Sequence, residues 1–225
     1  MQRIIILANG ELPSLGKARA LLQDDDFILC ADGGTRHASA LHLKPDLIIG
    51  DLDSADSALL RSLQADGVPI ERHPRDKNET DLELALHKAI ELAPQEIVIL
   101  AALGGRMDQT IANIALLTDA RLSTLDIRLD DGVEEIFFCR TQAQVEGRSG
   151  DLISLIPWGR EVTGIRTENL KWQLNGETLY PEKTRGISNK MTARTATVKI
   201  QSGLLLILHR RQPSIVNRQS KEGLP

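Results

Sequence analysis

Two aspartates separated by one residue close an apolar run in the first quarter of the chain. Leu47-Ile48-Ile49 leads directly into Gly50-Asp51-Leu52-Asp53-Ser54. Because side chains alternate along a strand, Asp51 and Asp53 are predicted to project to the same side at the strand's end, as a divalent cation on phosphate oxygens requires. Two such carboxylates repel each other by roughly 1 kcal/mol or more without a cation between them. The alternative is that Asp53 or Ser54 caps the following helix, which leaves Asp51 unexplained.

A second polar cluster, Ala31-Asp32-Gly33-Gly34, also follows a predicted strand and precedes a predicted helix. Asp32 and Gly33 are candidates for a ligand site, because glycines let backbone amides approach a phosphate or base closely. A Gly-Gly pair at a strand end is also what a plain turn looks like.

Two further clusters share this placement. In Asp76-Lys77-Asn78-Glu79-Thr80-Asp81, Thr80 or Asp81 is expected at a helix start, where the dipole favours anions, although a solvated loop explains the same run. In Gly104-Gly105-Arg106-Met107-Asp108-Gln109, Arg106 is a candidate to hold phosphate oxygens through its planar fork. Asp108 is expected either to cap the helix or to orient Arg106.

These clusters fall where short apolar runs give way to helical patterns, which indicates a parallel sheet wound with crossover helices. The predicted strands are Arg3–Ala8, Phe27–Ala31, Asp46–Ile49, Val68–Glu71, Glu96–Ala101 and Leu125–Leu129. The predicted helices are Lys17–Gln23, Arg36–Leu43, Ala55–Ala65, Asp81–Leu92 and Gln109–Leu117. In open α/β sheets ligands bind at the carboxyl edge, where all four clusters are expected.

The pattern changes after about Phe138, where turn signals separate short strand candidates. These candidates are Leu152–Ile156, Val162–Thr167, Thr195–Ile200 and Leu204–Leu208, the last suited to a central strand. The expected fold is α/β, with a doubly wound, mostly parallel nucleotide-binding domain over residues 1–140 followed by a small all-β sandwich domain over 145–212. Residues 213–225 are expected to form a flexible tail.

Composition excludes several function classes. The formal charge of −4, with acidic and basic residues interspersed, argues against a general nucleic-acid surface. The chain shows no membrane-length apolar run and no signal-peptide cleavage pattern, so we expect a cytoplasmic protein without a membrane partner. Cys30 and Cys139 lie in apolar, strand-like segments and are expected to be buried free thiols. The GxxxxGK[ST] and GxGxxG signatures are both missing, which removes the main support for a P-loop kinase or a dinucleotide-dependent dehydrogenase.

Taken in order, ADGG, GDLDS, DKNETD and GGRMDQ, followed by a β-rich region with Gly186-Ile187-Ser188-Asn189, resemble the thiamine pyrophosphokinase family. The resemblance implies transfer of the β,γ-diphosphate of ATP to the hydroxyl of thiamine, giving thiamine diphosphate and AMP with Mg²⁺. It also implies a homodimer with thiamine bound near the interface.

The resemblance carries roles to individual residues. Asp51, Asp53 and Asp81 match the acidic residues that engage magnesium and the phosphates. The nucleotide side is matched by Asp32, Gly33, Thr80, Arg106 and Asp108. The thiamine side is matched by Trp172, Ser188 and Asn189. Trp172 either stacks on the cationic thiazolium or the pyrimidine, or is a core aromatic of the sandwich.

Two positions depart from the family pattern. Asn78 stands where the third motif often has an acidic residue, and Gln109 where the fourth often ends in His.

Two other functions compete with the transferase. Asp51-Leu52-Asp53-Ser54 resembles the DxDx[TV] motif of haloacid-dehalogenase-like phosphohydrolases, although that motif normally ends the first strand and here two strands precede it. A non-catalytic nucleotide or thiamine sensor is the other alternative.

Overall fold

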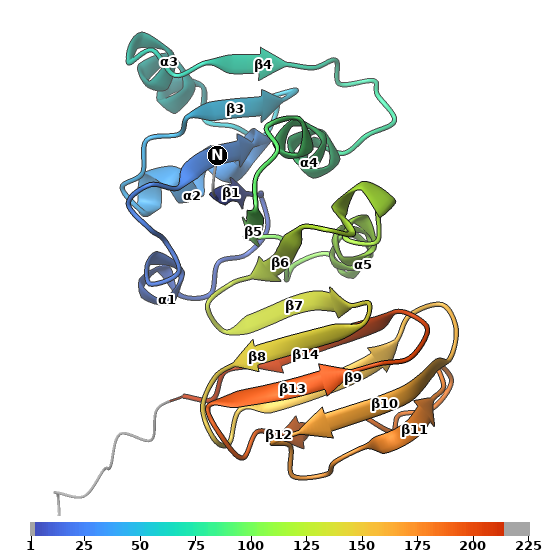
Figure 1. Ribbon diagram of the computed structural model, residues 1–225. Coiled ribbons are helices and arrows are strands. Elements are labelled where there is room, and N and C mark those ends of the chain that lie inside the picture. The colour runs from blue at the N-terminus through green and yellow to red at the C-terminus, as the bar shows by residue number, and fades with distance from the viewer. Residues whose placement is uncertain (1–2, 214–225) are drawn as a thin grey trace, which may run out of the picture.

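A computed structural model describes residues 3–213, and its first half is built on six parallel strands (Figure 1). These are β1 (Arg3–Leu7), β2 (Phe27–Ala31), β3 (Leu47–Gly50), β4 (Ile70–Arg72), β5 (Glu96–Leu100) and β6 (Asp126–Asp130). They lie in the order β6-β5-β1-β2-β3-β4. Because both faces of such a sheet are covered, its inner strands are largely apolar, and all five residues of β1 are buried.

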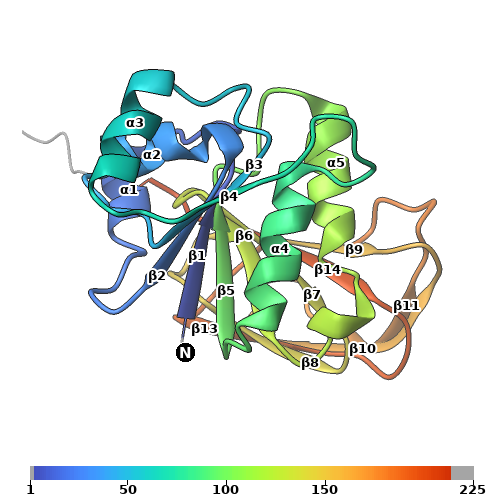
Figure 2. The same cartoon turned by 90° about the horizontal axis from the view of Figure 1, so that it is seen from above.

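Helices cover both faces of this parallel region, as Figure 2 shows. One face carries α1 (Leu15–Arg19), α2 (Thr35–Ala40) and α3 (Ser57–Ala65), and the other carries α4 (Asp81–Glu91) and α5 (Met107–Leu116). Alternate residues of β1 go to opposite cores, since Ile5 packs with Ala38 and Leu60 while Ile4 packs with the α4 and α5 side. Short 3-10 turns, η1 (Asp32–Gly34) and η2 (Ala120–Leu122), complete this half.

The second half is β-rich and antiparallel. Its strands are β7 (Glu134–Cys139), β8 (Gln142–Glu146), β9 (Leu152–Pro157), β10 (Val162–Glu168), β11 (Asn175–Leu179), β12 (Asn189–Lys190), β13 (Thr195–Lys199) and β14 (Leu205–Arg210). Four of them extend the parallel sheet to ten strands in the order β12-β9-β14-β7-β6, and the others form a separate sheet, β11-β10-β13-β8. A second apolar core, with Val145, Ile153, Ile165 and Val198, joins the two sheets.

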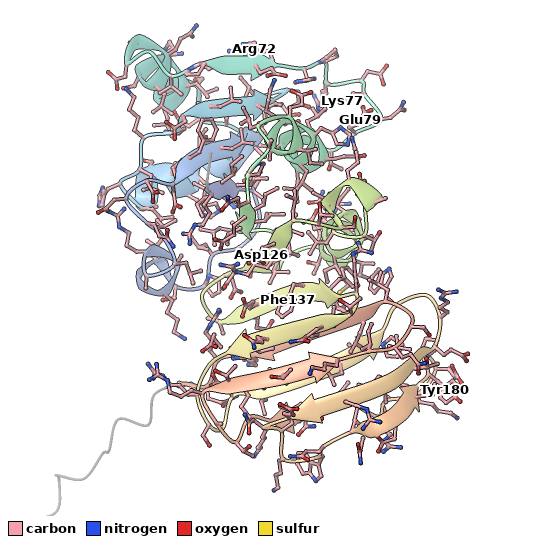
Figure 3. All side chains as sticks on the ribbon, in the orientation of Figure 1. Arg72, Lys77, Glu79, Asp126, Phe137 and Tyr180 are labelled. Atoms are coloured by element: carbon pink, nitrogen blue, oxygen red, sulfur yellow. The ribbon has the colours of Figure 1, made fainter. Side chains whose placement is uncertain are left out.

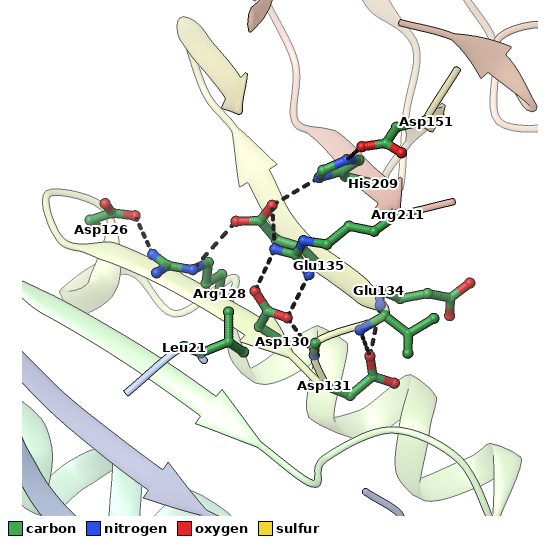
Figure 4. A network of polar contacts seen from close by, with 12 residues as sticks. Leu21, Asp126, Arg128, Asp130, Asp131, Glu134, Glu135, Asp151, His209 and Arg211 are labelled. Atoms are coloured by element: carbon green, nitrogen blue, oxygen red, sulfur yellow. Dashed lines mark hydrogen bonds and ion pairs between the residues drawn. The ribbon is translucent and has the colours of Figure 1, made fainter. Parts of the chain in front are cut away.

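A buried polar network lies where the parallel and antiparallel parts of the large sheet meet (Figure 4). His209 is 0 % exposed, and its Nδ1 and Nε2 lie 3.1 Å from Glu135 Oε2 and Asp151 Oδ2. The Arg211 guanidinium donates to both oxygens of Asp130 at 2.8 Å and also reaches Glu135. Arg128 Nε lies 3.3 Å from the other oxygen of Glu135. Polar groups on β6 and β7, just before β9 and at the end of β14 therefore satisfy one another.

The expected succession of an α/β half and a β-rich half is confirmed, and the strand predicted at Leu204–Leu208 is the central strand β14, which spans Leu205–Arg210 between β7 and β9. The prediction missed β7, β8, β11 and β12. The large sheet continues from the first half into the second, because β7 pairs with β6 on one side and with β14 on the other. The expected domain boundary between residues 140 and 145 therefore remains a proposal. Most of the expected tail, from residue 214, lies outside the described residues. No helix in residues 3–213 is long and apolar enough to cross a membrane.

Candidate active site

The carboxyl ends of β2 and β3 bring three aspartates together. Carboxylate oxygens of Asp32, Asp51 and Asp53 all lie within 4.8 Å of one another. Asp32 begins η1 directly after β2, and the other two follow β3 in the neighbouring position of the sheet. Adjacent parallel strands end at the same edge, so two sequence motifs that are far apart form one cluster.

Asp32 is the buried member of this cluster. Its residue is 5 % exposed, and its Oδ1 has no hydrogen-bond partner among the described residues. Burial raises the pKa of the Asp32 carboxyl above its ordinary value, although hydrogen bonds from Gly33 and Ser54 act in the opposite direction. A buried carboxylate oxygen without a partner is costly unless a ligand or cation meets it.

The close packing of the Asp32 turn needs the two glycines that follow. A Cβ on Gly34 would lie 1.9 Å from the carbonyl oxygen of Leu7, and a Cβ on Gly33 would lie 2.4 Å from the Asn9 side chain. Asp32 itself has a φ of +45°, in the left-handed region. The glycines therefore seat the turn against the end of β1 and hold Asp32 in place.

A tight turn after the strand, rather than strand alternation, brings Asp51 and Asp53 together. β3 ends at Gly50, and Leu52 has a φ of +65°. The Asp53 N–H donates to Asp51 Oδ1 at 3.1 Å, and this backbone hydrogen bond is the main cause of a lowered Asp51 pKa. The capping alternative is wrong, because Asp56 caps α3. Asp51 thus remains an ionised carboxylate in the cluster.

Thr80 and Asp81 stand at the start of α4, as predicted. The Thr80 hydroxyl caps the helix by accepting the Glu83 N–H at 3.2 Å. Asp81 Oδ1 accepts the Asp51 N–H at 3.3 Å and lies 3.0 Å from Lys77 Nζ. Gly50 makes this approach possible, since a Cβ there would lie 2.9 Å from Asp81 Oδ1. Asp81 adjoins the cluster, but its oxygen already has these two partners.

A pocket of about 220 Å³ opens beside these carboxylates. Its walls come from the ends of β1, β2 and β5 and from the starts of α4 and α5, and they include Asp32, Asp53, Thr80 and Asp81. Sequence reasoning missed Asn9 and Asn113, which also line it. Asn9-Gly10 follows a predicted strand as Asp32-Gly33 does, so the same signal was present for that pair.

Arg106 and Asp108 lie near the pocket but not in its wall. Gly104 lines the pocket, whereas the Arg106 side chain is 71 % exposed and is ion-paired with Asp108. Asp108 does not cap α5, whose N-cap residue is Arg106. The ion pair supports the second expectation for Asp108, that it orients Arg106, and the phosphate contact of Arg106 remains a prediction.

Trp172, Ser188 and Asn189 form a separate cluster in the β-rich half. The side-chain amide of buried Asn189 accepts the Trp172 N–H at 3.0 Å and donates to the Trp172 carbonyl at 2.6 Å. Trp172 is 55 % exposed, so the interpretation as a core aromatic is wrong, and Lys171 Nζ lies 4.8 Å from its ring centre. Ser188 is exposed, and its N–H donates to Ser154. Asn189 therefore fixes the backbone that presents an exposed indole.

The two clusters lie far apart within one chain. Seven strands of the large sheet separate β12, which carries Asn189, from β3, which leads into Asp51. At roughly 4.8 Å between neighbouring strands, this separation is on the order of 40 Å. Figure 1 accordingly places β3 and α4 in the upper half of the molecule and β12 in the lower half.

A parallel sheet with an acidic pocket at its carboxyl edge, joined to a β-rich half, defines an α/β protein with its ligand site where such sheets bind nucleotides. Residues 18–145 match the family model "Thiamin pyrophosphokinase, catalytic domain", and residues 140–205 match "Thiamin pyrophosphokinase, vitamin B1 binding domain". The chain belongs to the thiamin pyrophosphokinase family.

Individual relatives cover nearly the whole chain. A thiamine pyrophosphokinase of Bacillus subtilis is 26 % identical over 210 residues, covering 92 % of this chain and 98 % of the relative. Thiamine pyrophosphokinase 2 of Arabidopsis thaliana is 28 % identical over 228 residues, covering 89 % and 84 %. The crystal structure of the Bacillus subtilis enzyme superposes with a TM-score of 0.85 at 25 % identity, covering 94 % of this chain and 100 % of that one.

Proposed function

We propose that this protein transfers the β,γ-diphosphate of ATP to the hydroxyl of thiamine and releases AMP. The thiamine oxygen forms a bond to the β-phosphorus, the bond from that phosphorus to the α,β-bridging oxygen breaks, and the hydroxyl proton is released. The observation that carries the proposal is the cluster of Asp32, Asp51 and Asp53 beside the pocket, in a chain of this family.

The donor set suits Mg²⁺. The three aspartates offer only oxygen ligands, which a hard divalent cation prefers, and the partnerless Oδ1 of Asp32 is the kind of atom such a cation satisfies. We propose Asp51 and Asp53 as magnesium ligands, with Asp32 as a further ligand. Asp81 remains a predicted ligand, although its Oδ1 is held by Lys77 and the Asp51 N–H. When bound, the ion would neutralise charge on the phosphate oxygens and orient them for attack.

The protein's own groups then have mainly a positioning task. The start of α4, with the Thr80 cap, and the glycine-rich end of β5 face the same pocket, where free amides favour anionic phosphates. Arg106 stands at the rim as a further candidate for a phosphate contact. Holding the hydroxyl in line with the leaving AMP accounts for much of the rate enhancement in such reactions.

A second copy of the chain is needed to bring thiamine to the pocket. We propose Trp172 and Ser188 as thiamine contacts, with Asn189 supporting Trp172, and these residues lie on the order of 40 Å from Asp51 in one chain if strands are about 4.8 Å apart. Exposed apolar side chains are present on both halves: Met107 and Ile111 on α5 are 70 % and 53 % exposed, and Ile187 beside Ser188 is 50 % exposed. A homodimer that apposes the two halves would cover them and complete the site.

Some finer features of the fold and setting belong to the same proposal. The helices on both faces of the parallel region support its description as doubly wound, and the core shared by the two β-sheets supports a small sandwich. We propose a cytoplasmic location, in keeping with the buried free thiols Cys30 and Cys139.

The deciding experiment is incubation of the purified protein with ATP, Mg²⁺ and thiamine, followed by chromatography. Thiamine diphosphate and AMP are expected in equal amounts, with neither formed when thiamine is omitted. Release of inorganic phosphate without thiamine would instead support the phosphohydrolase. Calorimetric binding of ATP and thiamine without any AMP would support the sensor.

A further inference from the structure

The loop between β4 and α4 places two basic side chains on the proposed magnesium carboxylates. Lys77 Nζ lies 3.3 Å from Asp51 Oδ2 and 3.0 Å from Asp81 Oδ1, and Arg75 Nε lies 3.1 Å from Asp53 Oδ2. The Lys77 side chain is only 11 % exposed, whereas that of Arg75 is 83 % exposed. Figure 3 shows Lys77 on this loop beside α4. Lys77 is therefore built into the acidic site, whereas Arg75 contacts Asp53 from the solvent side.

Lys77 takes up much of the charge that a metal ion would otherwise neutralise. Its ammonium donates to the carboxylates of two different motifs, which lie at the ends of β3 and the loop. Burial lowers the pKa of Lys77, but the hydrogen bonds and charges of Asp81 and Asp51 outweigh burial and raise it. The amine is thus held as a cation between two carboxylates.

A divalent ion on this cluster competes for the same oxygens. Asp51 Oδ2 and Asp81 Oδ1 contact Lys77, and both belong to carboxylates that the proposed function gives to magnesium. A doubly charged ion attracts a carboxylate more strongly than an ammonium at the same distance. Lysine has a flexible stem and three rotatable donors, so its head group can move while the backbone stays in place.

We propose, on the basis of the proposed function, that Lys77 is a substrate-binding residue that changes partners between carboxylates and phosphates. Without metal it holds Asp51 and Asp81 and keeps the acidic pocket together. When a divalent ion takes these carboxylates, the ammonium turns to the phosphate oxygens of ATP in the adjoining pocket, which Thr80 and Asp81 line. Metal entry and triphosphate binding are thereby coupled through one side chain.

The test compares Lys77→Gln with wild type in two calorimetric titrations. With Mg²⁺ alone and no nucleotide, Lys77→Gln is expected to bind the ion about tenfold more tightly, as for a change of 1.4 kcal/mol. With ATP at saturating Mg²⁺ and no thiamine, it is expected to bind ATP about tenfold more weakly on the same scale. Lys77→Arg, which retains the charge, should restore most of the ATP affinity.

Arg72→Gln is the matched control, because it removes one positive charge from the adjacent strand β4. Among residues 3–213 Arg72 has no ion pair, so a general change of potential should affect both variants alike. Thermal unfolding should show that metal-free Lys77→Gln is folded and gains more stability from Mg²⁺ than wild type does. Unchanged or weaker Mg²⁺ binding by Lys77→Gln, or ATP affinity equal to that of Arg72→Gln, would refute the proposal. Neither titration uses thiamine or turnover, so these results are separate from those that test the proposed reaction.

Discussion

At the scale of single residues, the acidic site concentrates like charges that a folded chain normally keeps apart. Asp32, Asp51 and Asp53 approach within 4.8 Å, and the nearby cations Lys77 and Arg75 neutralise only part of this charge. Asp32 is the extreme case, because its carboxylate is buried and one oxygen has no partner among the described residues. Such an arrangement lowers stability, and the proposed cation would offset that cost.

The first prediction concerns Asp51 and Asp53. Changing either residue to Asn should lower turnover at least about 100-fold, as for a loss of roughly 3 kcal/mol of transition-state stabilisation. The fold should survive, because both side chains lie in the turn after β3 and belong to none of the apolar cores. Production of AMP at saturating ATP and thiamine measures the first effect, and urea unfolding measures the second. Asp76→Asn, an exposed change in the β4–α4 loop, is the control. An activity loss no larger than the loss of stability explains would contradict the assignment.

The second prediction uses the raised pKa of Asp32. A carboxyl whose pKa is higher in the folded than in the unfolded state destabilises the fold as it ionises. This cost begins as the pH rises above the ordinary pKa of 3.8 and is complete above the raised folded value. Asp32→Asn should therefore melt at a higher temperature than wild type at neutral pH, by about 2–4 °C for each kcal/mol recovered.

The pH dependence distinguishes this effect from a general one. Below pH 3.8 the wild-type carboxyl is protonated in both states, so the gain from Asp32→Asn should disappear. Metal-free samples melted between pH 3 and 8 provide the measurement, with exposed Asp24→Asn as the control. A lower melting temperature for Asp32→Asn at neutral pH would show that the carboxylate supports the fold rather than a ligand.

The sequence was sufficient to find these aspartates but not their partners. Asp51, Asp53, Thr80 and Asp81 stand in motifs that punctuate a clear alternation of strands and helices, so their edge of the sheet was predictable. The pairing of Lys77 with two carboxylates depends on the path of a loop, which local propensity does not determine. The grouping of Asp32 with Asp51 rather than Asp81 depends on turns such as that at Leu52, where the positive φ was not predictable.

At the scale of elements, the strands of the parallel half could be predicted from the sequence better than those of the β-rich half. The predicted range of β2 agrees with the structure at both ends, and β3 and β5 differ by one residue at one or both ends, because buried parallel strands are uniformly apolar. β7 was missed because its sequence begins with Glu134-Glu135 and its burial does not alternate. Buried Glu135 has its partners on neighbouring strands: Arg128 on β6, and His209 and Arg211, which the pairing of β14 with β7 brings to it.

The third prediction concerns that pairing. His209→Gln should lower the free energy of unfolding by about 1–3 kcal/mol, because it removes the buried ring that bridges Glu135 and Asp151 through hydrogen bonds. A double-mutant cycle with Glu135→Gln should show coupling above about 0.5 kcal/mol. Urea unfolding supplies both values. His87→Gln, at a partly exposed site on α4, is the control and should change stability by less than about 0.5 kcal/mol. Additive effects of the two changes would show that the network is not a cooperative unit.

At the scale of the whole molecule, the ten-stranded sheet limits how the proposed two-copy site could be assembled. It holds the acidic cluster and the Trp172 cluster near its opposite edges, since β3 and β12 are separated by seven strands. Buried contacts on both sides of β7 and β14 make this sheet one body, so bending it to join the clusters would disrupt two cores. Figure 3 likewise shows Lys77 and Tyr180 in opposite halves. Bringing the acidic cluster of one copy to the Trp172 cluster of another would leave the sheet intact.

The last prediction follows from this geometry. Asp51→Asn and Trp172→Ala should each be inactive alone. The assay uses a thiamine concentration too low for Trp172→Ala to turn over. In a heterodimer of the two, one site contains both changes and the other contains neither, because each site takes its acidic cluster from one copy and its indole from the other. Random exchange of subunits should thus restore about a quarter of wild-type activity, since about half of the dimers are mixed and each has one intact site. The measurement is AMP formation after the two variants are co-refolded, with each variant refolded alone as the control. Sites contained within single chains would give no recovery at any mixing ratio, because every chain would then carry one of the two defects.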